Sequence, residues 1–332
     1  MARPAALLPN RDSKTFMKIS KVFFLVILVA LTTCSGGSAV REKSVPRETG
    51  PPSTLQSPGA HVDVTQIASL AKGHVGASAV VLETGETVAS LNAQDHFPMQ
   101  SVYKLPISMA VMKQVDAGKI NLDQKVAVTK GDFVRVGQYS PIRDRNPNGT
   151  EITVSELLRF AISESDGTAS DVLMKLAGGR IPVQMYVTDL AVTDMIVLNT
   201  EKELGQDWQV QYRNSATPEA AIALLRALHE KRGLSESSQA LLLKYMIEST
   251  PGTKRIKGLL PTGTIVAHKT GTSGTEKGIT AATNDIGIIT LPNGKHLAIA
   301  VFVSDSPADE ATREGVIAKI AKAAWDAVSG KQ

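Results

Sequence analysis

Strand-forming segments lie towards both ends of this chain, and they constrain its fold more than any other feature. Two apolar, β-branched runs occur early, at residues 76–84 and 87–92, and three occur late, at 264–270, 285–291 and 296–304. A strand buries its apolar face by pairing with other strands in a sheet. The sequence therefore predicts an α+β fold in which the first and last parts of the chain meet in one sheet, with helices inserted between them.

Helix signals fill the segment between the two groups of strands. Thr153 and Glu156 form a capping-box pattern before SELLRFAI, and Thr217-Pro218 has the cap-then-proline order of a helix start. Further helices are predicted at 64–73, 101–117 and roughly 307–328. We expect one domain over residues 61–330, with a helical subdomain at about 105–255.

The first 39 residues are organised like an export signal. Lys18 and Lys21 precede the apolar run VFFLVILVAL (22–31), and small residues follow up to Ala39. This run is too short to cross a bilayer as a helix. We therefore expect a signal peptide at 1–39, with Met17 as an alternative start, then a flexible leader at 40–60 and a periplasmic protein.

The cysteine count and the charge distribution exclude several classes of protein. Cys34 is the only cysteine; it is a candidate for lipidation, but Thr33 fits a lipoprotein signal poorly, so cleavage after Ala39 is favoured. A mature chain without cysteine has no disulfide, thiol nucleophile or thiolate zinc site. Residues 1–50 hold eight of the 36 Lys/Arg and three of the 32 Asp/Glu, so the remainder is near neutral. We expect no nucleic-acid partner.

A serine and a lysine share one helical face in MQSVYKLP (99–106). Ser101 and Lys104 are three residues apart, at the start of an apolar helix. A serine hydroxyl becomes a good nucleophile when an adjacent base takes its proton, and a partly desolvated lysine can do this. By itself Ser-x-x-Lys is too short to distinguish a catalytic pair from a surface serine beside a snorkelling lysine.

Two further stretches favour the catalytic interpretation. ISESDGTASDVL (162–173) places Ser165 and Asp166 between two helices, and AHKTGTSG (267–274) places Lys269 at the end of a β-branched strand. A strand that ends in Lys-Thr-Gly offers a cation, a hydroxyl and an unhindered backbone edge to a flat, anionic substrate. In this order and at these separations, coincidence is a weak explanation for the three stretches.

From about residue 62 to 328 the chain resembles the class A serine β-lactamases, whose signature combines Ser-x-x-Lys, Ser-Asp-Asn and Lys-Thr-Gly. The stretches MQSVYKLP, VQYRNS (210–215) and RIKGLLPTGTIVAHKTGTSG (255–274) are most similar to the PER and VEB extended-spectrum branch. The resemblance implies an α/β sandwich: a five-stranded antiparallel sheet covered by the N- and C-terminal helices, beside a helical region.

The resemblance also implies the roles of individual residues. Ser101 would be the acylated nucleophile, Lys104 its proton partner, and Ser165 the residue that passes a proton to the leaving nitrogen. The substrate would be bound by Lys269, Thr270, Gly271, Thr272 and Gly167, with Tyr139 beside the site entrance. The backbone N–H groups of Ser101 and Thr272 would form the oxyanion hole.

Glu201 is the expected deacylation base, because it keeps the family's spacing to Ser165, although Glu203 lies only two residues on. Whether lysine or glutamate is the base for acylation stays open. Arg255 is the expected second cation for the substrate carboxylate, since the position used by most class A enzymes is Ile286 here. A surface ion pair is the other interpretation of Arg255.

Four positions depart from the family pattern. Gly167 replaces the asparagine of Ser-Asp-Asn, and Gly205 stands where most members have an asparagine that helps to hold the deacylating water. Asn199 and Asn214 replace the arginine and aspartate that join the ends of the intervening loop. We expect a roomy site that accepts bulky cephalosporins and a loop that folds differently or opens wider.

Two other functions remain as alternatives. A penicillin-binding D,D-peptidase or sensor would acylate and stall, and a non-catalytic binding protein would share the scaffold. No cofactor and no metal site are predicted, because the six histidines form no close-spaced pair along the chain: His61, His74, His96, His229, His268 and His296. His268 should face away from Lys269 and be structural. We expect a monomer that binds small β-lactams, with no stable membrane partner after signal cleavage.

Overall fold

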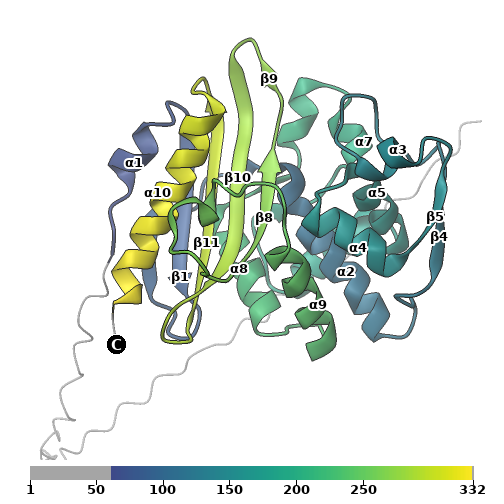
Figure 1. The fold of residues 1–332 in the computed structure, drawn as a ribbon, viewed down its shortest axis with the longest axis horizontal. Coiled ribbons are helices and arrows are strands. Elements are labelled where there is room, and N and C mark those ends of the chain that lie inside the picture. The colour runs from purple at the N-terminus through teal and green to yellow at the C-terminus, as the bar shows by residue number, and fades with distance from the viewer. Residues whose placement is uncertain (1–60, 331–332) are drawn as a thin grey trace, which may run out of the picture. The chain divides into compact units, whose positions relative to one another are not determined.

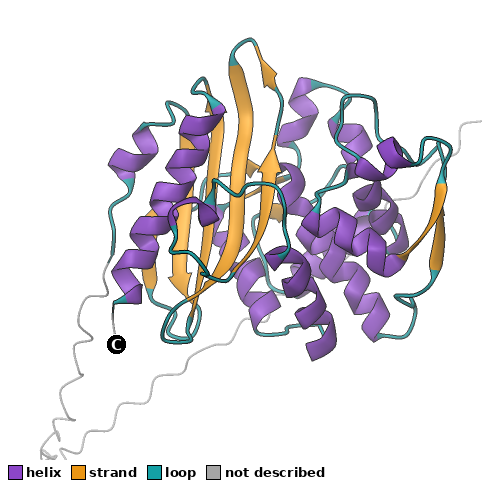
Figure 2. Ribbon diagram, in the orientation of Figure 1, coloured by secondary structure: helices purple, strands orange, loops and turns teal. Residues whose placement is uncertain are grey.

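Five long strands form the central sheet of the computed structural model, which describes residues 61–330 (Figures 1 and 2). Their order is β2-β1-β11-β10-β8, and every neighbouring pair is antiparallel. The strands are β1 (His74–Val81), β2 (Thr87–Leu91), β8 (Val266–Thr272), β10 (Ile279–Thr290) and β11 (His296–Ser306). The predicted α+β fold with its five-stranded antiparallel sheet is confirmed. A short sixth strand, β9 (Thr275–Glu276), pairs with the start of β10 and was not predicted.

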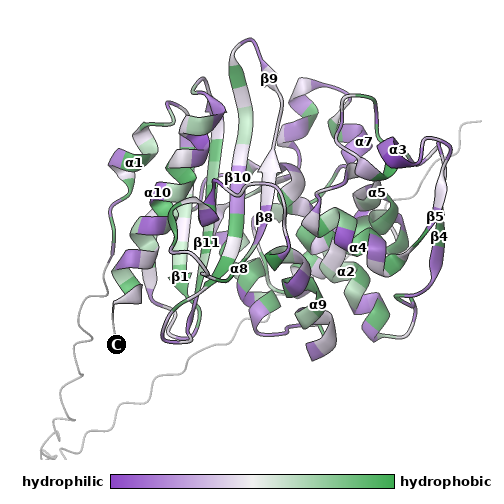
Figure 3. Ribbon diagram, viewed as in Figure 1, coloured by the Kyte–Doolittle hydropathy of each residue, from purple (hydrophilic) through white to green (hydrophobic). Residues whose placement is uncertain are grey.

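The strands are apolar on both faces because both faces are covered. Leu297, Ile299 and Val301 of β11 belong to one buried cluster, while the alternate residues Ala298 and Phe302 belong to another. This period of two assigns successive side chains to opposite faces of the sheet. Figure 3 shows the resulting hydrophobic stretches along β10 and β11.

Helices from both ends of the described chain cover one face of the sheet, as predicted. On this face α10 (Glu310–Ser329) packs against β11, β10 and α1 (Thr65–Ser69) (Figure 1). On the other face α8 (Pro218–His229) packs against β1, β10 and β11. The sheet therefore lies between two helical layers, and its edge strand β8 faces the remaining helices.

The remaining helices lie between β2 and β8 in sequence. They are α2 (Lys104–Asp116), α3 (Pro141–Arg145), α4 (Val154–Ser163), α5 (Gly167–Leu176), α6 (Arg180–Asp189), α7 (Glu201–Leu204) and α9 (Glu236–Ile247), with 3₁₀ turns η1 (Gln100–Tyr103), η2 (Trp208–Tyr212) and η3 (Ile256–Leu259). Short strands accompany them: β3 (Phe97–Pro98), β4 (Lys125–Val128), β5 (Thr150–Thr153), β6 (Met195–Ile196) and β7 (Ser215–Ala216).

The predicted helix starts are present. Thr153 and Glu156 form a reciprocal capping box at the start of α4. Thr217 caps α8 through the Ala220 N–H, with Pro218 in the first helical position. These caps satisfy backbone donors that a helix leaves unpaired at its N-terminus.

Among the element boundaries that differ from the prediction, three lie close to the predicted site. Strand β10 begins at Ile279 rather than at 285, and β8 continues to Thr272, so Lys-Thr-Gly lies within the strand. The helix predicted from residue 101 is the 3₁₀ turn η1 followed by α2. Gln100, the first residue of η1, has a left-handed φ of +47°. Side-chain patterns do not reveal such a local change of backbone conformation.

The predicted signal peptide (1–39), the leader (40–60) and Cys34 lie outside the described residues. Within residues 61–330, no helix is both long enough and apolar enough to span a bilayer.

Candidate active site

A cavity of about 660 Å³ opens where η1, the start of α2 and the end of β8 meet. This volume is typical of small-molecule sites. Seven of the residues predicted for the site line it: Ser101, Lys104, Tyr139, Ser165, Glu201, Thr270 and Thr272. Residues from η1 and α2, from the helical region and from strand β8 therefore line one cavity.

Lys104 connects the parts of this cavity. It is the first residue of α2, is only 1% exposed, and follows Ser101 by three residues. Its Nζ donates to the Ser165 carbonyl oxygen at 2.7 Å and lies 3.2 Å from Glu201 Oε2. A buried ammonium group requires such partners. The lysine is thus positioned between the Ser165 segment and the Glu201 carboxylate.

Lys269 is the second buried ammonium group. Its Nζ donates to Ser165 Oγ at 2.8 Å and to the Thr270 carbonyl oxygen at 3.0 Å. Burial, and then the charge of Lys104, lower the pKa of Lys269 well below its usual value. Ser165 has a left-handed φ of +60°, which non-glycine residues seldom adopt. Ser165 contacts both lysines, an arrangement suited to moving a proton.

Asp166 organises the loops around Ser165. It is fully buried and caps α5 by accepting the Ala169 N–H at 2.8 Å. It also accepts the Ile142 N–H at 2.7 Å and the Ser140 hydroxyl at 3.1 Å. Burial raises the pKa of this carboxyl. These bonds tie the loop that carries Tyr139 to the Ser165 segment.

Glu201, at the start of α7, points its carboxylate towards the same lysine. Its Oε2 accepts a hydrogen bond of 2.6 Å from the Tyr103 hydroxyl, in addition to the contact with Lys104. Burial, followed by the charge of Glu201, raises the pKa of Tyr103 well above its usual value. Tyr103 is therefore a neutral donor that orients Glu201.

Glu203 has a different task. With Thr200 it forms a capping box at the start of α7, and its Oε2 accepts the Asn199 amide at 3.1 Å. Glu203 does not line the cavity, whereas Glu201 does. The geometry favours Glu201 of the two candidate bases.

Asp171 of α5 holds the backbone at Glu201. Its two carboxylate oxygens accept the N–H groups of Glu201 at 2.6 Å and of Lys202 at 3.0 Å. Burial raises the pKa of Asp171 to about 6, although both hydrogen bonds oppose the increase. Burying this carboxylate costs free energy, but its two hydrogen bonds fix the backbone of the segment that carries Glu201.

Amide groups close the loop that was expected to open. Asn214 Oδ1 accepts the N–H groups of Leu198 at 2.8 Å and of Asn199 at 2.9 Å, and its Nδ2 donates to the Asn199 carbonyl oxygen at 2.8 Å. Asn214 is completely buried. The family's ion pair is absent, and neutral hydrogen bonds join the ends of the loop in its place.

Arg255 is buried, and protein groups occupy its guanidinium. It pairs with Glu314 at 3.1 Å and donates to the carbonyl oxygens of Gly271 at 3.2 Å and Asn284 at 2.9 Å. Its Nη2 donates to Thr272 Oγ1 at 2.9 Å. Arg255 is buried, so the ion pair with Glu314 is not the surface pair of the alternative interpretation. Arg255 does not line the cavity and reaches it through the Thr272 hydroxyl.

Gly271 brings β8 close to the turn that carries Ser101. A Cβ at this position would lie 2.3 Å from the Met99 carbonyl oxygen, so only glycine permits this approach. Gly271 does not line the cavity.

Tyr139 lines the cavity, and 62% of it is exposed, in keeping with a position at the entrance.

The two glycines that depart from the family pattern leave no empty space. A Cβ at Gly167 would lie 2.6 Å from Glu201 Cγ, and a Cβ at Gly205 would lie 2.5 Å from Gln138 Cδ. The Gln138 amide donates to the Glu201 carbonyl oxygen and accepts the Arg135 N–H at 3.0 Å. Other side chains therefore occupy the places of the missing ones.

Tyr103, Gln138 and Asp171 were not predicted as site residues. Tyr103 lies within the quoted MQSVYKLP, and Asp171 lies one helical turn after Gly167, but neither position has a polar pattern of its own. His268 is structural as predicted: it is fully buried, and its Nδ1 lies 3.0 Å from Asp285. Gln138 directly precedes the predicted Tyr139, but only the folded chain reveals its contacts with Glu201 and Arg135.

The family model described as the β-lactamase enzyme family matches residues 60–328. The chain is 43% identical to the β-lactamase VEB-1 of Pseudomonas aeruginosa over 238 residues, which cover 71% of this chain and 79% of that protein. It is 44% identical to the extended-spectrum β-lactamase PER-1 of the same organism over 237 residues, 71% of this chain and 76% of that one. The chain therefore belongs to the β-lactamase family and is a class A serine β-lactamase.

Solved structures agree with this assignment. A β-lactamase from Chitinophaga pinensis superposes with a TM-score of 0.77 at 48% identity, covering 80% of this chain and 97% of that one. The extended-spectrum β-lactamase TLA-3 gives a TM-score of 0.76 at 41% identity, with 80% and 100% covered. The resemblance seen in the sequence is confirmed.

Proposed function

We propose that this enzyme opens β-lactams through an acyl-enzyme on Ser101. The Ser101 oxygen attacks the lactam carbonyl carbon, the carbon–nitrogen bond breaks, and Ser165 protonates the leaving nitrogen. Lys104, in contact with Glu201 and the Ser165 segment, handles the serine proton, either directly or with Glu201 and a water. The backbone N–H groups of Ser101 and Thr272 stabilise the oxyanion.

Deacylation requires a base near the ester. Glu201 takes a proton from a water molecule, whose oxygen attacks the ester carbonyl carbon, and Ser101 leaves with a proton. The observation that carries this proposal is the carboxylate of Glu201, which lines the cavity of Ser101 and is held by Tyr103 and Lys104. A D,D-peptidase that only acylates would not need this carboxylate.

The substrate carboxylate would meet a positively charged side of the cavity. Lys269 lies behind Ser165, and Arg255 holds the Thr272 hydroxyl, so Thr270 and Thr272 present their groups in a cationic field. We expect penicillins and cephalosporins to bind, including oxyimino-cephalosporins. Poor turnover of oxyimino-cephalosporins relative to penicillins would contradict the broader range.

The mechanism is tested by a time course with a chromogenic cephalosporin. We expect sustained turnover by the wild-type enzyme and a burst of about one equivalent from Glu201→Gln, with an acyl-enzyme visible by mass spectrometry. A matched Glu203→Gln variant should continue to turn over. A burst that stalls in the wild-type enzyme would favour the penicillin-binding alternative, and no reaction at all would favour the binding protein.

The same proposal includes export and a monomeric state. Cleavage after Ala39 predicts that the protein from the periplasmic fraction begins at Val40. N-terminal sequencing distinguishes this from a lipidated chain that begins at Cys34. Size-exclusion chromatography with light scattering should give the mass of one chain.

A further inference from the structure

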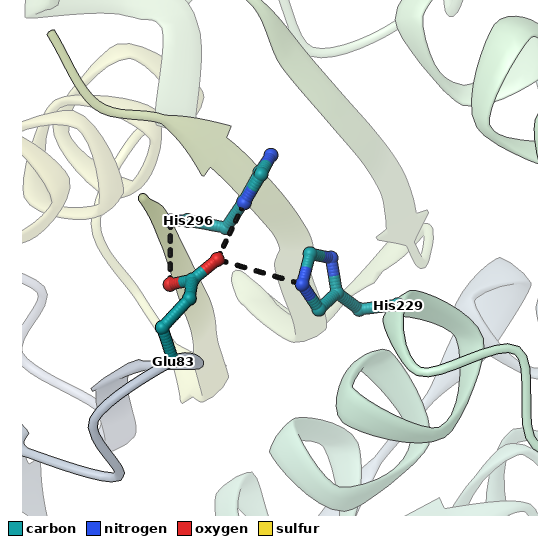
Figure 4. Close-up of side chains that lie close together, drawn as sticks. All are labelled: Glu83, His229 and His296. Atoms are coloured by element: carbon teal, nitrogen blue, oxygen red, sulfur yellow. Dashed lines mark hydrogen bonds and ion pairs between the residues drawn. The ribbon is translucent and has the colours of Figure 1, made fainter. Parts of the chain in front are cut away.

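Three side chains from distant parts of the chain meet away from the catalytic cavity. Glu83 follows β1, His229 is the last residue of α8, and His296 is the first residue of β11 (Figure 4). One ligand atom from each lies within 4.8 Å of the others. We propose that Glu83, His229 and His296 bind a divalent transition metal such as Zn²⁺, a site distinct from the catalytic centre.

The distances are close to those of a metal site. Glu83 Oε1 lies 3.5 Å from His229 Nε2 and 2.7 Å from His296 Nδ1. Ligands in tetrahedral zinc sites are about 3.3 Å apart, because each bond is about 2.0–2.1 Å long. Small side-chain rotations therefore suffice to place an ion between the three atoms.

The carboxylate is held in place for this role. Glu83 Oε2 accepts the backbone N–H of His296 at 2.9 Å, which leaves Oε1 directed at the two rings. Such hydrogen bonds orient metal ligands. Metal binding requires His296 to carry its proton on Nε2, the nitrogen that points away from Glu83 in Figure 4.

The local charges permit a cation. His229 is at the C-terminal end of α8, where the helix dipole favours cations. Arg226 lies nearby, but its guanidinium donates to the Leu82 carbonyl oxygen and pairs with Glu230 at 3.5 Å.

The site is open to solvent and separate from the chemistry. The side chains of Glu83, His229 and His296 are 33%, 25% and 31% exposed to solvent, so water can complete the coordination of an ion. His296 pairs with Thr290 of β10, and Thr272 pairs with Thr283 of the same strand. The two positions are therefore seven residues apart along β10. This separation corresponds to roughly 23 Å at about 3.3 Å per residue.

Isothermal titration of the metal-free, untagged protein with ZnCl₂ tests the site. We expect one equivalent to bind the wild-type enzyme, at least tenfold weaker binding by His229→Gln and by His296→Gln, and unchanged binding by the control His74→Gln. His74 pairs with Asp95 at 2.9 Å and stacks on Phe97, and it belongs to no predicted ligand cluster. MgCl₂ should not bind, because imidazole ligands favour transition metals.

Two further measurements separate binding from folding and catalysis. Circular dichroism should show that the variants are folded, and Zn²⁺ should raise the thermal midpoint of the wild-type enzyme only. Zinc-soaked crystals should show an anomalous peak between the three side chains. Absence of zinc binding to the wild-type enzyme, or binding by both variants that is as tight as binding by the wild-type enzyme, would overturn the proposal. β-Lactam hydrolysis should be unchanged in every case, so this test is independent of the catalytic mechanism.

Discussion

Gly167 and Glu201 are packed so closely that a Cβ on the glycine would lie 2.6 Å from the Cγ of the glutamate. Gly167 also donates its N–H to the Tyr139 carbonyl oxygen at 3.1 Å, which fixes its backbone. Restoring a side chain at residue 167 therefore displaces the group that we propose as the deacylation base.

Gly167→Ala and Gly167→Asn should both slow deacylation at least tenfold while acylation changes less. The reason is that Glu201 must move from Lys104 and Tyr103 to make room. Rapid-mixing kinetics should show accumulation of the acyl-enzyme. Gly315→Ala is the control, since a Cβ there meets nothing within 4 Å. Faster hydrolysis by Gly167→Asn would contradict this account of the site.

Gly205 and Gln138 should behave as a coupled pair. Gly205→Asn alone should reduce kcat, because its Cβ would push the Gln138 amide off the Glu201 carbonyl oxygen. The double variant with Gln138→Ala should lose less than the sum of the two single changes. Strict additivity of the two effects in kcat would show that the residues act independently.

Arg255 should contribute to stability more than an exposed cation does. Arg255→Met leaves Glu314, whose side chain is 12% exposed, without this partner, and removing one member of a fully buried pair costs about 3–5 kcal/mol, which is an upper bound here. Lys322→Met, which removes an exposed pair with Asp326, should cost about 0–1 kcal/mol. Urea unfolding measures both. The KM of any remaining Arg255→Met enzyme should rise, because Thr272 loses its donor; equal stability of the two variants would contradict the prediction.

Asp171 should make stability decrease as the pH rises from about 4 to about 6. Its pKa is about 6 in the folded protein against 3.8 in the unfolded chain, so in this range the folded state holds a proton that the unfolded state has lost. The stabilisation is complete below pH 4 and is lost above pH 6, by up to about 3 kcal/mol.

Asp171→Asn should remove this pH dependence. It should also be less stable at every pH, because one amide oxygen cannot accept both N–H groups. Urea unfolding of both proteins at pH 4.5 and pH 7.5 measures the difference. Parallel pH profiles would show that Asp171 does not titrate in this range.

Sequence patterns predicted the parts of the fold that depend on residues close together in the chain. The apolar run of β11 and the capping box of α4 involve neighbouring residues, so both can be recognised in the sequence. The burial of Arg255 depends on Glu314 and Asn284, which are 59 and 29 residues away. The Gln138 contact and the raised pKa of Asp171 likewise arise where separate segments meet, and no local pattern encodes them.

The contact between Asn199 and Asn214 has a consequence for the conditions under which the enzyme works. An ion pair loses strength in concentrated salt and when its acid is protonated, whereas two amides carry no charge to screen or titrate. The hydrogen bonds between Asn199 and Asn214 should therefore be equally strong in dilute and saline, acidic and neutral surroundings, whereas the Asp171 contact with the same segment changes with pH.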